Sequence, residues 1–485
     1  MDTDVIIIGT GFGGSVVAAR AAAAGRRVIA LERGLRLSPG DWDALAAGRE
    51  SLLHGPHSRG PGEVHAYRGL GALTGSGLGG GSRIYTSVTI RAKPETFHQG
   101  WPRDWTADTL EPHYARVQAR IAPSPAPDGH PRAAALERIG AALGVPVTRL
   151  PLAVHWPHKS TYVATPRDDG PPLADLVRWM QGGTTAPKRS LDQTYLADAL
   201  RDGADLRTGC AAEVIEPIPG GYRVHYEHFD GDTHVAHCVT GRRVVLAAGT
   251  LNTLRLLFAQ RDQHRTLPRL GPQLGRRFHT NGDRGAMLIG PDADLRPDHG
   301  PPVTAWLDHW DSDRLFIMEM GTPPAWRRPI AAVLSIFAPR AARRRAVPPY
   351  LWNFGVMGLD GVVGRLVPAI GGRLRHEFDR RRAGEFSRRV LTRLRAVAAA
   401  AGARLLAAPA WVDRFMPVTV HALGGACLAD DSTSGVTDSL GEVFGHPGLF
   451  IADGSLLPTP TGVPPSMTIA ALAERVADRL LAGLP

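Results

Sequence analysis

The chain has 485 residues, of which 43% are hydrophobic and 21% charged, a composition typical of a globular protein with room for two domains. Its formal charge is +10 at pH 7, but lysine occurs only at positions 93, 159 and 188, so nearly all the positive charge is arginine. No arginine tract is interleaved with aromatic residues as in a single-strand groove, which argues against nucleic-acid binding.

The N-terminal segment predicts a dinucleotide-binding unit. An apolar strand over 4–8 leads into the glycine-rich turn 9–14, which is followed by an alanine-rich helix over 15–25 and a second strand over 27–31. In such a unit Gly9 allows the tight turn, Gly11 lets the backbone approach a pyrophosphate, and Gly14 lets the helix pack closely on the strand. Glu32 follows the second strand, about 20 residues after the glycine-rich turn. An acid at this position accepts hydrogen bonds from an adenosine ribose.

Further strands of the same kind occur far along the chain. Residues 205–245 have the alternation and turn signals of a β-meander that ends in a buried strand over 243–249, and a helix is expected over 250–259. A helix is also expected over 388–401, a strand over 450–454, and a last helix from Pro465. Such widely separated strands are typical of a discontinuous sheet around an extended cofactor, which favours FAD over NAD.

The expected fold class is therefore α/β, with an FAD-binding Rossmann-like domain of the glutathione-reductase type and an interleaved α+β substrate domain. Segments 1–100, 185–285 and 415–485 are predicted to build the FAD-binding domain, and segments 101–184 and 286–414 the substrate-binding domain or lid. Paired prolines at 301–302, 323–324 and 348–349 indicate loops in the variable region.

Cysteine usage and the N-terminus bear on compartment. The three cysteines are odd in number and lack metal-ligand spacing, so we expect reduced thiols and no metal site. The first strand begins almost at Met1, and no apolar run reaches the roughly 18 residues of a membrane span. We therefore predict a cytoplasmic protein without membrane association. The arginine-rich segment 326–345 is interpreted as a solvated face, with a lid or an amphipathic docking surface as alternatives.

Several motifs together resemble the glucose–methanol–choline (GMC) oxidoreductase family, in the branch that includes cholesterol oxidase. The matching pieces are the N-terminal turn, Gly79-Gly80-Gly81-Ser82, Ala247-Ala248-Gly249-Thr250, the segment 421–427, and the tail from Asp453 to Glu474; residues 286–410 match weakly. The resemblance implies FAD as cofactor, with Tyr85 near the flavin ring, Val214 contacting adenine through its backbone, and Asp453 on the ribityl chain. The predicted cofactor-binding residues are Gly9, Gly11, Phe12, Gly13, Gly14, Glu32, Arg33, Gly80, Gly81, Ser82, Tyr85, Val214, Ala248, Gly249, Asp453, Gly454, Pro465, Ser466 and Met467.

The resemblance also assigns catalytic roles. His421 matches the histidine that faces the flavin, and an imidazole is suited to accept the hydroxyl proton near neutral pH. In the family this histidine is paired with an asparagine or a second histidine, whereas Pro464 stands at that position here and cannot donate a hydrogen bond. Amides near Ser466 and Met467 would stabilise negative charge on the reduced flavin. Glu319 is a candidate acid over the substrate, or else a core-edge glutamate on a strand.

We therefore predict an FAD-dependent oxidoreductase that oxidises a hydroxyl group on a bulky, largely apolar small molecule. His421 serves as base, and dioxygen or another electron acceptor reoxidises the flavin. The alternative, suggested by Pro464, is a flavin-dependent lyase or isomerase, or an oxidation–elimination on a biosynthetic intermediate. A non-catalytic flavoprotein is a third reading, and the retained His421 weighs against it.

Overall fold

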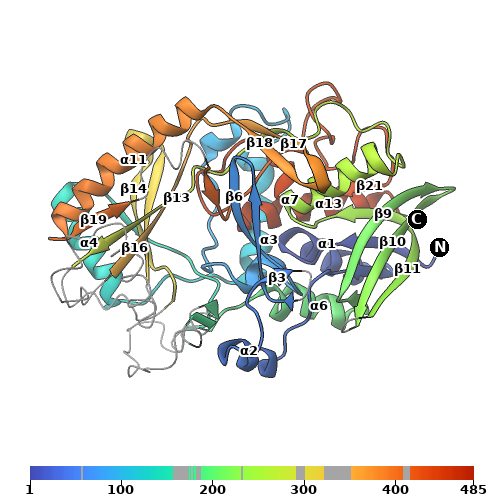
Figure 1. Cartoon of the computed structure of the whole chain (residues 1–485), viewed down its shortest axis with the longest axis horizontal. Helices are drawn as coiled ribbons and strands as arrows, with labels where there is room; N and C mark the ends of the chain where they lie inside the picture. The colour runs from blue at the N-terminus through green and yellow to red at the C-terminus, as the bar shows by residue number, and fades with distance from the viewer. Residues whose placement is uncertain are drawn as a thin grey trace.

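The computed structural model describes residues 1–55, 58–156, 174, 176–177, 180–181, 187–230, 233–290, 301–321, 351–407 and 416–484. Two large sheets lie toward opposite ends of the long axis, and both chain termini lie at the end that carries the seven-stranded sheet (Figure 1). The chain ends and the meander build that sheet, while residues from the middle of the chain build the other. Segment 326–345 and the proline pairs at 323–324 and 348–349 lie outside the described residues.

The seven-stranded sheet has the order β8-β2-β1-β11-β10-β9. The seventh strand, β21, pairs with the C-terminal end of β11 on the side away from β1. Strands β8, β2, β1, the end of β11, and β21 run parallel, and the rest of β11 turns back through β10 and β9 as the expected meander. The parallel strands β1 and β2, the end of β11, and β21 are short and largely apolar runs buried on both faces, whereas β8 at the sheet edge is partly exposed. Their bounds are β1 Thr3–Ile8, β2 Val28–Leu31, β8 Asp205–Arg207, β9 Cys210–Ile218, β10 Gly221–Asp230, β11 Thr233–Leu246 and β21 Leu449–Ile451.

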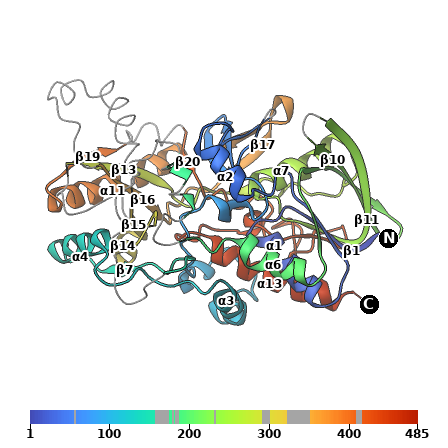
Figure 2. The same ribbon diagram turned by 90° about the horizontal axis from the view of Figure 1, so that it is seen from below.

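Helices from distant parts of the chain pack together on one face of this sheet (Figure 2). Helix α1 (Phe12–Ala23) packs against α13 (Ser466–Ala482) and α6 (Tyr195–Arg201), and α13 packs in turn against α3 (Ala107–Ile121). Helix α7 (Thr250–Phe258) follows β11 directly. The first and last helices are thus neighbours, which brings the two ends of the polypeptide to one place.

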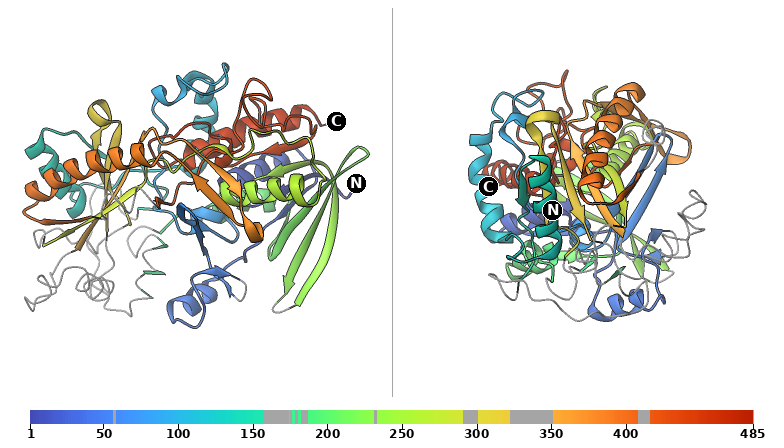
Figure 3. Two further views of the ribbon diagram at one scale, coloured as in Figure 1. Left: turned by 45° about the horizontal axis from the view of Figure 1, so that its top comes forward. Right: turned by 90° about the vertical axis from the view of Figure 1, so that its left-hand side faces the viewer.

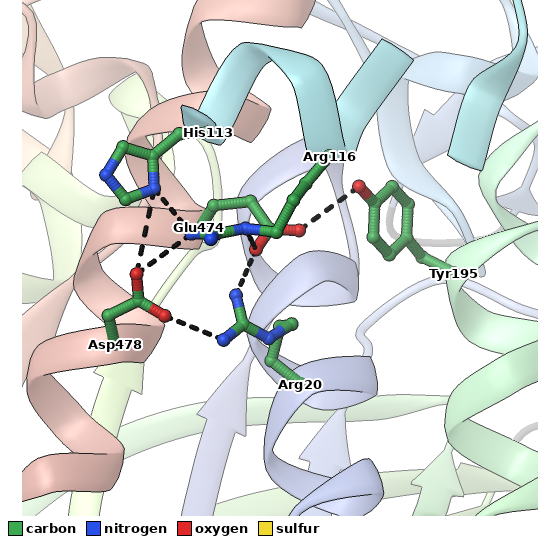
Figure 4. Close-up of polar contacts among 6 residues, drawn as sticks. All are labelled: Arg20, His113, Arg116, Tyr195, Glu474 and Asp478. Atoms are coloured by element: carbon green, nitrogen blue, oxygen red, sulfur yellow. Dashed lines mark hydrogen bonds and ion pairs between the residues drawn. The ribbon is translucent and has the colours of Figure 1, made fainter. Parts of the chain in front are cut away.

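A buried ion-pair cluster ties these helices together (Figure 4). The Glu474 side chain of α13 is 2% exposed and accepts hydrogen bonds from arginines of α1 and α3 and from the Tyr195 hydroxyl of α6. Asp478, one turn further on, accepts from the same two arginines. Burial is tolerated because the charges are paired. The members of this cluster, called the Glu474 cluster below, are Arg20, His113, Arg116, Tyr195, Glu474 and Asp478.

The six-stranded antiparallel sheet has the order β19-β13-β16-β15-β14-β7. Helices α4 (Pro131–Leu143) and α11 (Arg380–Ala400) cover one face, where an apolar cluster fills the space between (Figure 3). Side chains alternate along each strand, so the remaining positions face the other side of the sheet. The strand bounds are β7 Val147–Arg149, β13 Arg284–Ile289, β14 Ala305–His309, β15 Leu315–Met320, β16 Leu351–Gly358 and β19 Arg404–Ala407.

Smaller elements complete the described structure. Three-stranded sheets form from β20-β6-β5 and β12-β17-β18, and β3 pairs with β4. Their bounds are β3 His54–Gly55, β4 Ser58–Arg59, β5 Gly62–Tyr67, β6 Leu70–Gly75, β12 Arg276–Phe278, β17 Gly364–Pro368, β18 Leu374–Glu377 and β20 Val418–Thr419, and two short helices are α2 Pro39–Ala46 and α8 Trp310–Asp313. Among the described residues, no helix combines the length and apolarity needed to cross a bilayer.

The expected α/β fold with a discontinuous Rossmann-like sheet is confirmed, and the bounds of its first elements differ from the prediction by a few residues. Helix α1 begins at Phe12, inside the glycine turn, and α11 begins at Arg380, because Asp379 caps it by accepting from the amides of Arg381 and Arg382. The division into FAD-binding and substrate segments stays a prediction, although α3 of segment 101–184 packs on α13.

Candidate functional site

A cavity of about 1070 Å³ lies between the two large sheets. Its lining comes from the turn after β1, the segment after β6, the start of α7, the open face of the six-stranded sheet, and the segments around His421, Asp453 and Pro464. Parts of the chain more than 400 residues apart thus face one space. It accommodates a long extended ligand and leaves room for a second molecule.

The glycines of the first turn have different physical roles. A Cβ at Gly13 would lie 1.4 Å from the carbonyl oxygen of Ala452, and one at Gly14 would lie 1.9 Å from that of Gly9, so both glycines are required for packing. A Cβ at Gly11 would meet none of the described atoms within 4 Å, because Gly11 faces the open cavity. Among the described residues no side chain caps α1, so its first amides are directed at this space.

Glu32 lies at the cavity wall with both carboxylate oxygens engaged. One oxygen accepts from the Thr10 amide at 3.0 Å and the Thr10 hydroxyl at 2.8 Å; the other accepts from the amides of Gly34 at 3.0 Å and Gly77 at 3.3 Å. A carboxylate offers about four acceptor sites. A ribose hydroxyl would therefore share an oxygen with one of these donors. Arg33 also lines the cavity and pairs with Glu63.

Asp453 is buried and holds two chain segments that face the cavity. One of its oxygens accepts from the Gly249 amide at 3.0 Å and the Thr253 hydroxyl at 2.6 Å, and the other from the amide and hydroxyl of Ser455 at 2.9 and 2.6 Å. Burial raises the pKa of this carboxyl above its usual value. Asp453 thus joins the start of α7 to the end of β21, and Ala248, Gly249 and Gly454 line the cavity around it.

The glycine-rich segment after β6 brings backbone and an aromatic ring to the cavity. Gly80 and Gly81 line the space, whereas the Ser82 hydroxyl is buried and donates to the Gly79 carbonyl at 2.7 Å. The Tyr85 ring packs edge-on against Phe12 with centroids 5.3 Å apart, and both residues line the cavity. Burial raises the pKa of Tyr85, so the hydroxyl stays protonated.

The N-terminus of α13 also faces the cavity. Pro465 is the N-cap residue, and no side chain caps this helix among the described residues. Pro465 and Ser466 line the cavity; the Ser466 hydroxyl donates to the Val88 carbonyl at 3.1 Å, which leaves the first amides of the helix free to interact with a ligand. The Met467 side chain is buried in the core. Val214 does not line the cavity, although its neighbours Ala212 and Glu213 do.

His421 lines the cavity and is paired with an acid that the sequence did not reveal. Its Nδ1 lies 2.8 Å from Oδ1 of Asp283, and their side chains are 18% and 12% exposed. The other oxygen of Asp283 accepts from the Thr419 hydroxyl at 2.7 Å and the Val420 amide at 3.0 Å. These donors fix the carboxylate. An ionised Asp283 holds the proton of a neutral imidazole on Nδ1, so Nε2 carries the lone pair.

Pro464 lines the cavity at the end of a loop that a buried asparagine holds. Asn281 donates from Nδ2 to the Val463 carbonyl at 2.8 Å and accepts from the Gly462 amide at 2.9 Å. The segment that carries Asp283 therefore also positions the loop before α13. The sequence signal for Asn281 and Asp283 was the polar run 279–283 directly before a strand, and this pattern indicates only a turn.

Glu319 lies away from the cavity, so the role expected for it over the substrate needs correction. Strand alternation directs Met318 and Met320 to the cavity and Glu319 to the covered face. There Glu319 is fully buried, accepts from the Thr304 amide at 2.7 Å, and pairs with Arg132. Its surroundings fit the core-edge alternative. No cluster of metal-ligating side chains occurs within the part of the chain that the structure describes.

Comparison with known proteins gives consistent matches over nearly the whole chain. The N-terminal and C-terminal models of the GMC oxidoreductase family match residues 3–280 and 374–473. Cholesterol oxidase of Mycobacterium tuberculosis is 28% identical, over 98% of this chain and 91% of that protein. The 6'''-hydroxyparomomycin C oxidase of Streptomyces lividus is 27% identical, over 99% and 92%. The crystal structure of pyridoxine 4-oxidase from Mesorbium loti superposes with a TM-score of 0.67 at 18% identity, over 98% of both chains.

Proposed function

The chain belongs to the GMC oxidoreductase family, and within that family we propose that it oxidises the hydroxyl group of a bulky, largely apolar molecule with His421 as base. Members of this family are FAD-dependent and act on alcohol groups, so FAD is the cofactor and an alcohol is oxidised. The finer assignments, namely the base, the substrate and the electron acceptor, are proposed from the geometry of the cavity.

The residues at the cavity fit FAD. Gly11 leaves open the space that a side chain would fill, beside the uncapped N-terminus of α1, where a pyrophosphate is stabilised. The uncapped N-terminus of α13 supplies a second set of amides to the same cavity. When bound, FAD would supply the hydride acceptor for the alcohol oxidation. The amides near Ser466 and Met467, at the positive end of α13, would favour negative charge on its ring.

The observation that carries the proposal is the pair of His421 and Asp283 at the wall of the cavity. Asp283 fixes the imidazole so that the basic Nε2 is available to take the hydroxyl proton as the hydride leaves. The carboxylate also stabilises the imidazolium that this transfer forms. Pro464 contributes no donor to the alkoxide, so His421 must both accept the proton and remain hydrogen-bonded to the substrate oxygen.

Part of the cavity wall is apolar. Met318, Met320 and Met357 face the cavity from the six-stranded sheet, and Leu423 lies two residues beyond His421. Flexible thioether side chains accommodate irregular apolar shapes. This lining supports a bulky, weakly polar substrate. For the acceptor we propose dioxygen, because two of the relatives described above are named as oxidases.

The placement of Glu319 bears on the lyase or isomerase alternative. An isomerisation needs an acid near the substrate, and Glu319 is buried on the other face of the sheet in an ion pair. Pro464 alone supports that alternative, and the paired base supports alcohol oxidation more directly. We therefore retain oxidation as the single proposed reaction.

Anaerobic mixing with a panel of alcohols tests the proposal. We expect loss of flavin absorbance with at least one apolar alcohol, and peroxide formation once oxygen is admitted. His421→Ala should bind FAD normally and slow flavin reduction by about 10²–10⁴-fold. His264→Ala, which alters an exposed histidine, is the matched control. Reduction of the His421 variant at the wild-type rate would exclude this base, and turnover without any redox change would exclude oxidation.

A further inference from the structure

Two glycines face each other inside the six-stranded sheet. Gly285 of β13 pairs directly with Gly355 of β16, and Gly355 pairs on its other side with Met318 of β15. Both glycines line the cavity. Glycine weakens a strand interior because it adds backbone entropy to the unfolded chain and packs no side chain. Two adjacent glycines on one face therefore require an explanation.

The usual structural reasons for strand glycines do not apply here. The β13–β16 and β15–β16 ladders run without a register shift, so neither glycine is in a bulge. Neither appears among the residues with positive φ. Among the described residues, a Cβ at Gly285 would meet nothing within 4 Å, and one at Gly355 would meet only methionine side-chain atoms, at 3.2 and 3.5 Å. No other described backbone approaches either position, so the remaining reason is close approach of a ligand.

The side chains around the pair leave a bare strip of sheet. Phe354 and Val356, on either side of Gly355, belong to the apolar cluster on the opposite face. Met318 and Met320 border the strip on the cavity side. Gly285 is exposed; it pairs with β16 on one side, and the ladder with β19 on the other side covers only Ala286–Ile289. Asp283 lies two residues before Gly285, just ahead of β13, so their Cα atoms are at most about 7 Å apart, and the strip begins beside the His421–Asp283 pair.

We propose that the Gly285–Gly355 pair forms a slot that selects substrates whose hydroxyl is carried on a flat ring system. This inference rests on the proposed function, since it names the substrate class of the same cavity. Without side chains, the peptide planes of two strands offer a flat surface on which a ring lies in van der Waals contact, in the layer that Cβ atoms would otherwise occupy. The two methionines at the border favour an aromatic ring, because thioether sulfur makes favourable contacts with ring edges.

Filling the slot tests the proposal. Gly285→Val is the main variant, because the open space around this position lets the fold accept the side chain; Gly285→Ala is the smaller step. Ala236→Val, at an exposed position of β11, is the matched control for added volume in a strand. The rate of anaerobic flavin reduction is measured with 2-naphthalenemethanol and with 1-hexanol. Binding of naphthalene-2-carboxamide, which carries no hydroxyl, is measured separately by perturbation of the flavin spectrum.

We expect the ratio of kcat/KM for the naphthyl alcohol to that for hexanol to fall about 10-fold or more in Gly285→Val, and less in Gly285→Ala. Binding of the carboxamide should weaken in the same order, and Ala236→Val should change neither quantity. An unchanged ratio, or equal loss for both alcohols, would overturn the slot. If the wild-type protein oxidised no alcohol, the proposed function would fail, and binding of the carboxamide alone would then test the slot. Weaker binding by Gly285→Val would support the slot. Absent binding, or binding unaffected by Gly285→Val, would overturn it.

Discussion

Replacing Asp283 with asparagine isolates the role of the carboxylate that holds His421. The substitution preserves the size and shape of a side chain that is 12% exposed and accepts three hydrogen bonds, from the Thr419 hydroxyl, the Val420 amide and His421 Nδ1. An asparagine oxygen can keep the first two donors only if its NH₂ group faces the imidazole. Nδ1 must then accept a hydrogen bond, and the proton of the neutral ring moves to Nε2. The nitrogen that faces the substrate would lose its lone pair.

The size of the effect follows from the loss of the correct tautomer and of the charge beside the imidazolium. A unit charge at about 4 Å contributes about 4 kcal/mol at an effective dielectric constant near 20, and an enforced wrong tautomer in a comparable His–Asp pair lowers turnover by about 10⁴. We therefore expect Asp283→Asn to slow flavin reduction by about 10²–10⁴-fold. Stability should fall by only about 1.5–3 kcal/mol, the usual contribution of hydrogen bonds to a charged group.

This rate is measured directly by stopped-flow mixing under anaerobic conditions. The FAD-loaded protein is mixed with an alcohol from the panel that the wild-type protein oxidises. Thr419→Val is the control. It removes one donor to the carboxylate and the acceptor of the His421 amide, but it leaves the charge and the Asp283–His421 hydrogen bond in place; it should lower the rate by about 10-fold or less. FAD content and melting temperature show whether each variant is folded. A folded, FAD-loaded Asp283→Asn protein that reduces its flavin within about three-fold of wild type would refute the tautomer argument.

Three further predictions concern the cofactor cradle and stability. Gly11→Ala should fold normally but bind FAD more weakly, because its Cβ projects into the open cavity. Gly13→Ala should lose both stability and FAD, because its Cβ would lie 1.4 Å from a carbonyl oxygen. FAD content and circular dichroism distinguish the two variants. Glu474→Gln should lower the free energy of unfolding by about 2–4 kcal/mol, since it leaves two part-exposed arginines without their buried partner, and Asp478→Asn, whose side chain is 41% exposed, by about 1 kcal/mol or less. Burial raises the pKa of Asp360 to about 6, so ionisation opposes folding and stability is lost as the pH rises from about 4 to 6. Asp360→Asn should therefore raise the free energy of unfolding by about 1–3 kcal/mol at about pH 7.5. At about pH 4 the same variant should change it little. Equal effects of Asp360→Asn at both pH values would contradict this assignment.

The dinucleotide-binding half could be predicted from sequence because its determinants are local. In residues 4–32 a buried strand, a glycine turn, a helix and an acid follow one another, and each restricts the next. The last helix could likewise be predicted from its apolar stripe and from Pro465 at its start. Where prediction and structure differ, as at the start of α11, three consecutive arginines obscured a helix that an aspartate caps.

The His421–Asp283 pair could not be predicted because it depends on tertiary contacts. Asp283 lies 138 residues before His421, and its own neighbourhood has only the composition of a turn. The sequence left two roles open for Glu319 for a different reason. A period of two shows that Glu319 and Met318 face opposite sides of β15, but not which side is covered by helices. Only the packing of α4 and α11 on the sheet decides that.

One short segment accounts for how the separate parts of the site are aligned. Asn281 holds the loop that ends at Pro464, Asp283 holds His421, and Gly285 opens the proposed slot. Asn281 and Gly282 form a turn with positive φ directly before β13 begins at Arg284. The ladder with β16 fixes Arg284 and Gly285 in register. Because a single residue separates Asp283 from Gly285, the proposed base and the proposed slot are held close together, although His421 and Gly355 come from distant parts of the sequence.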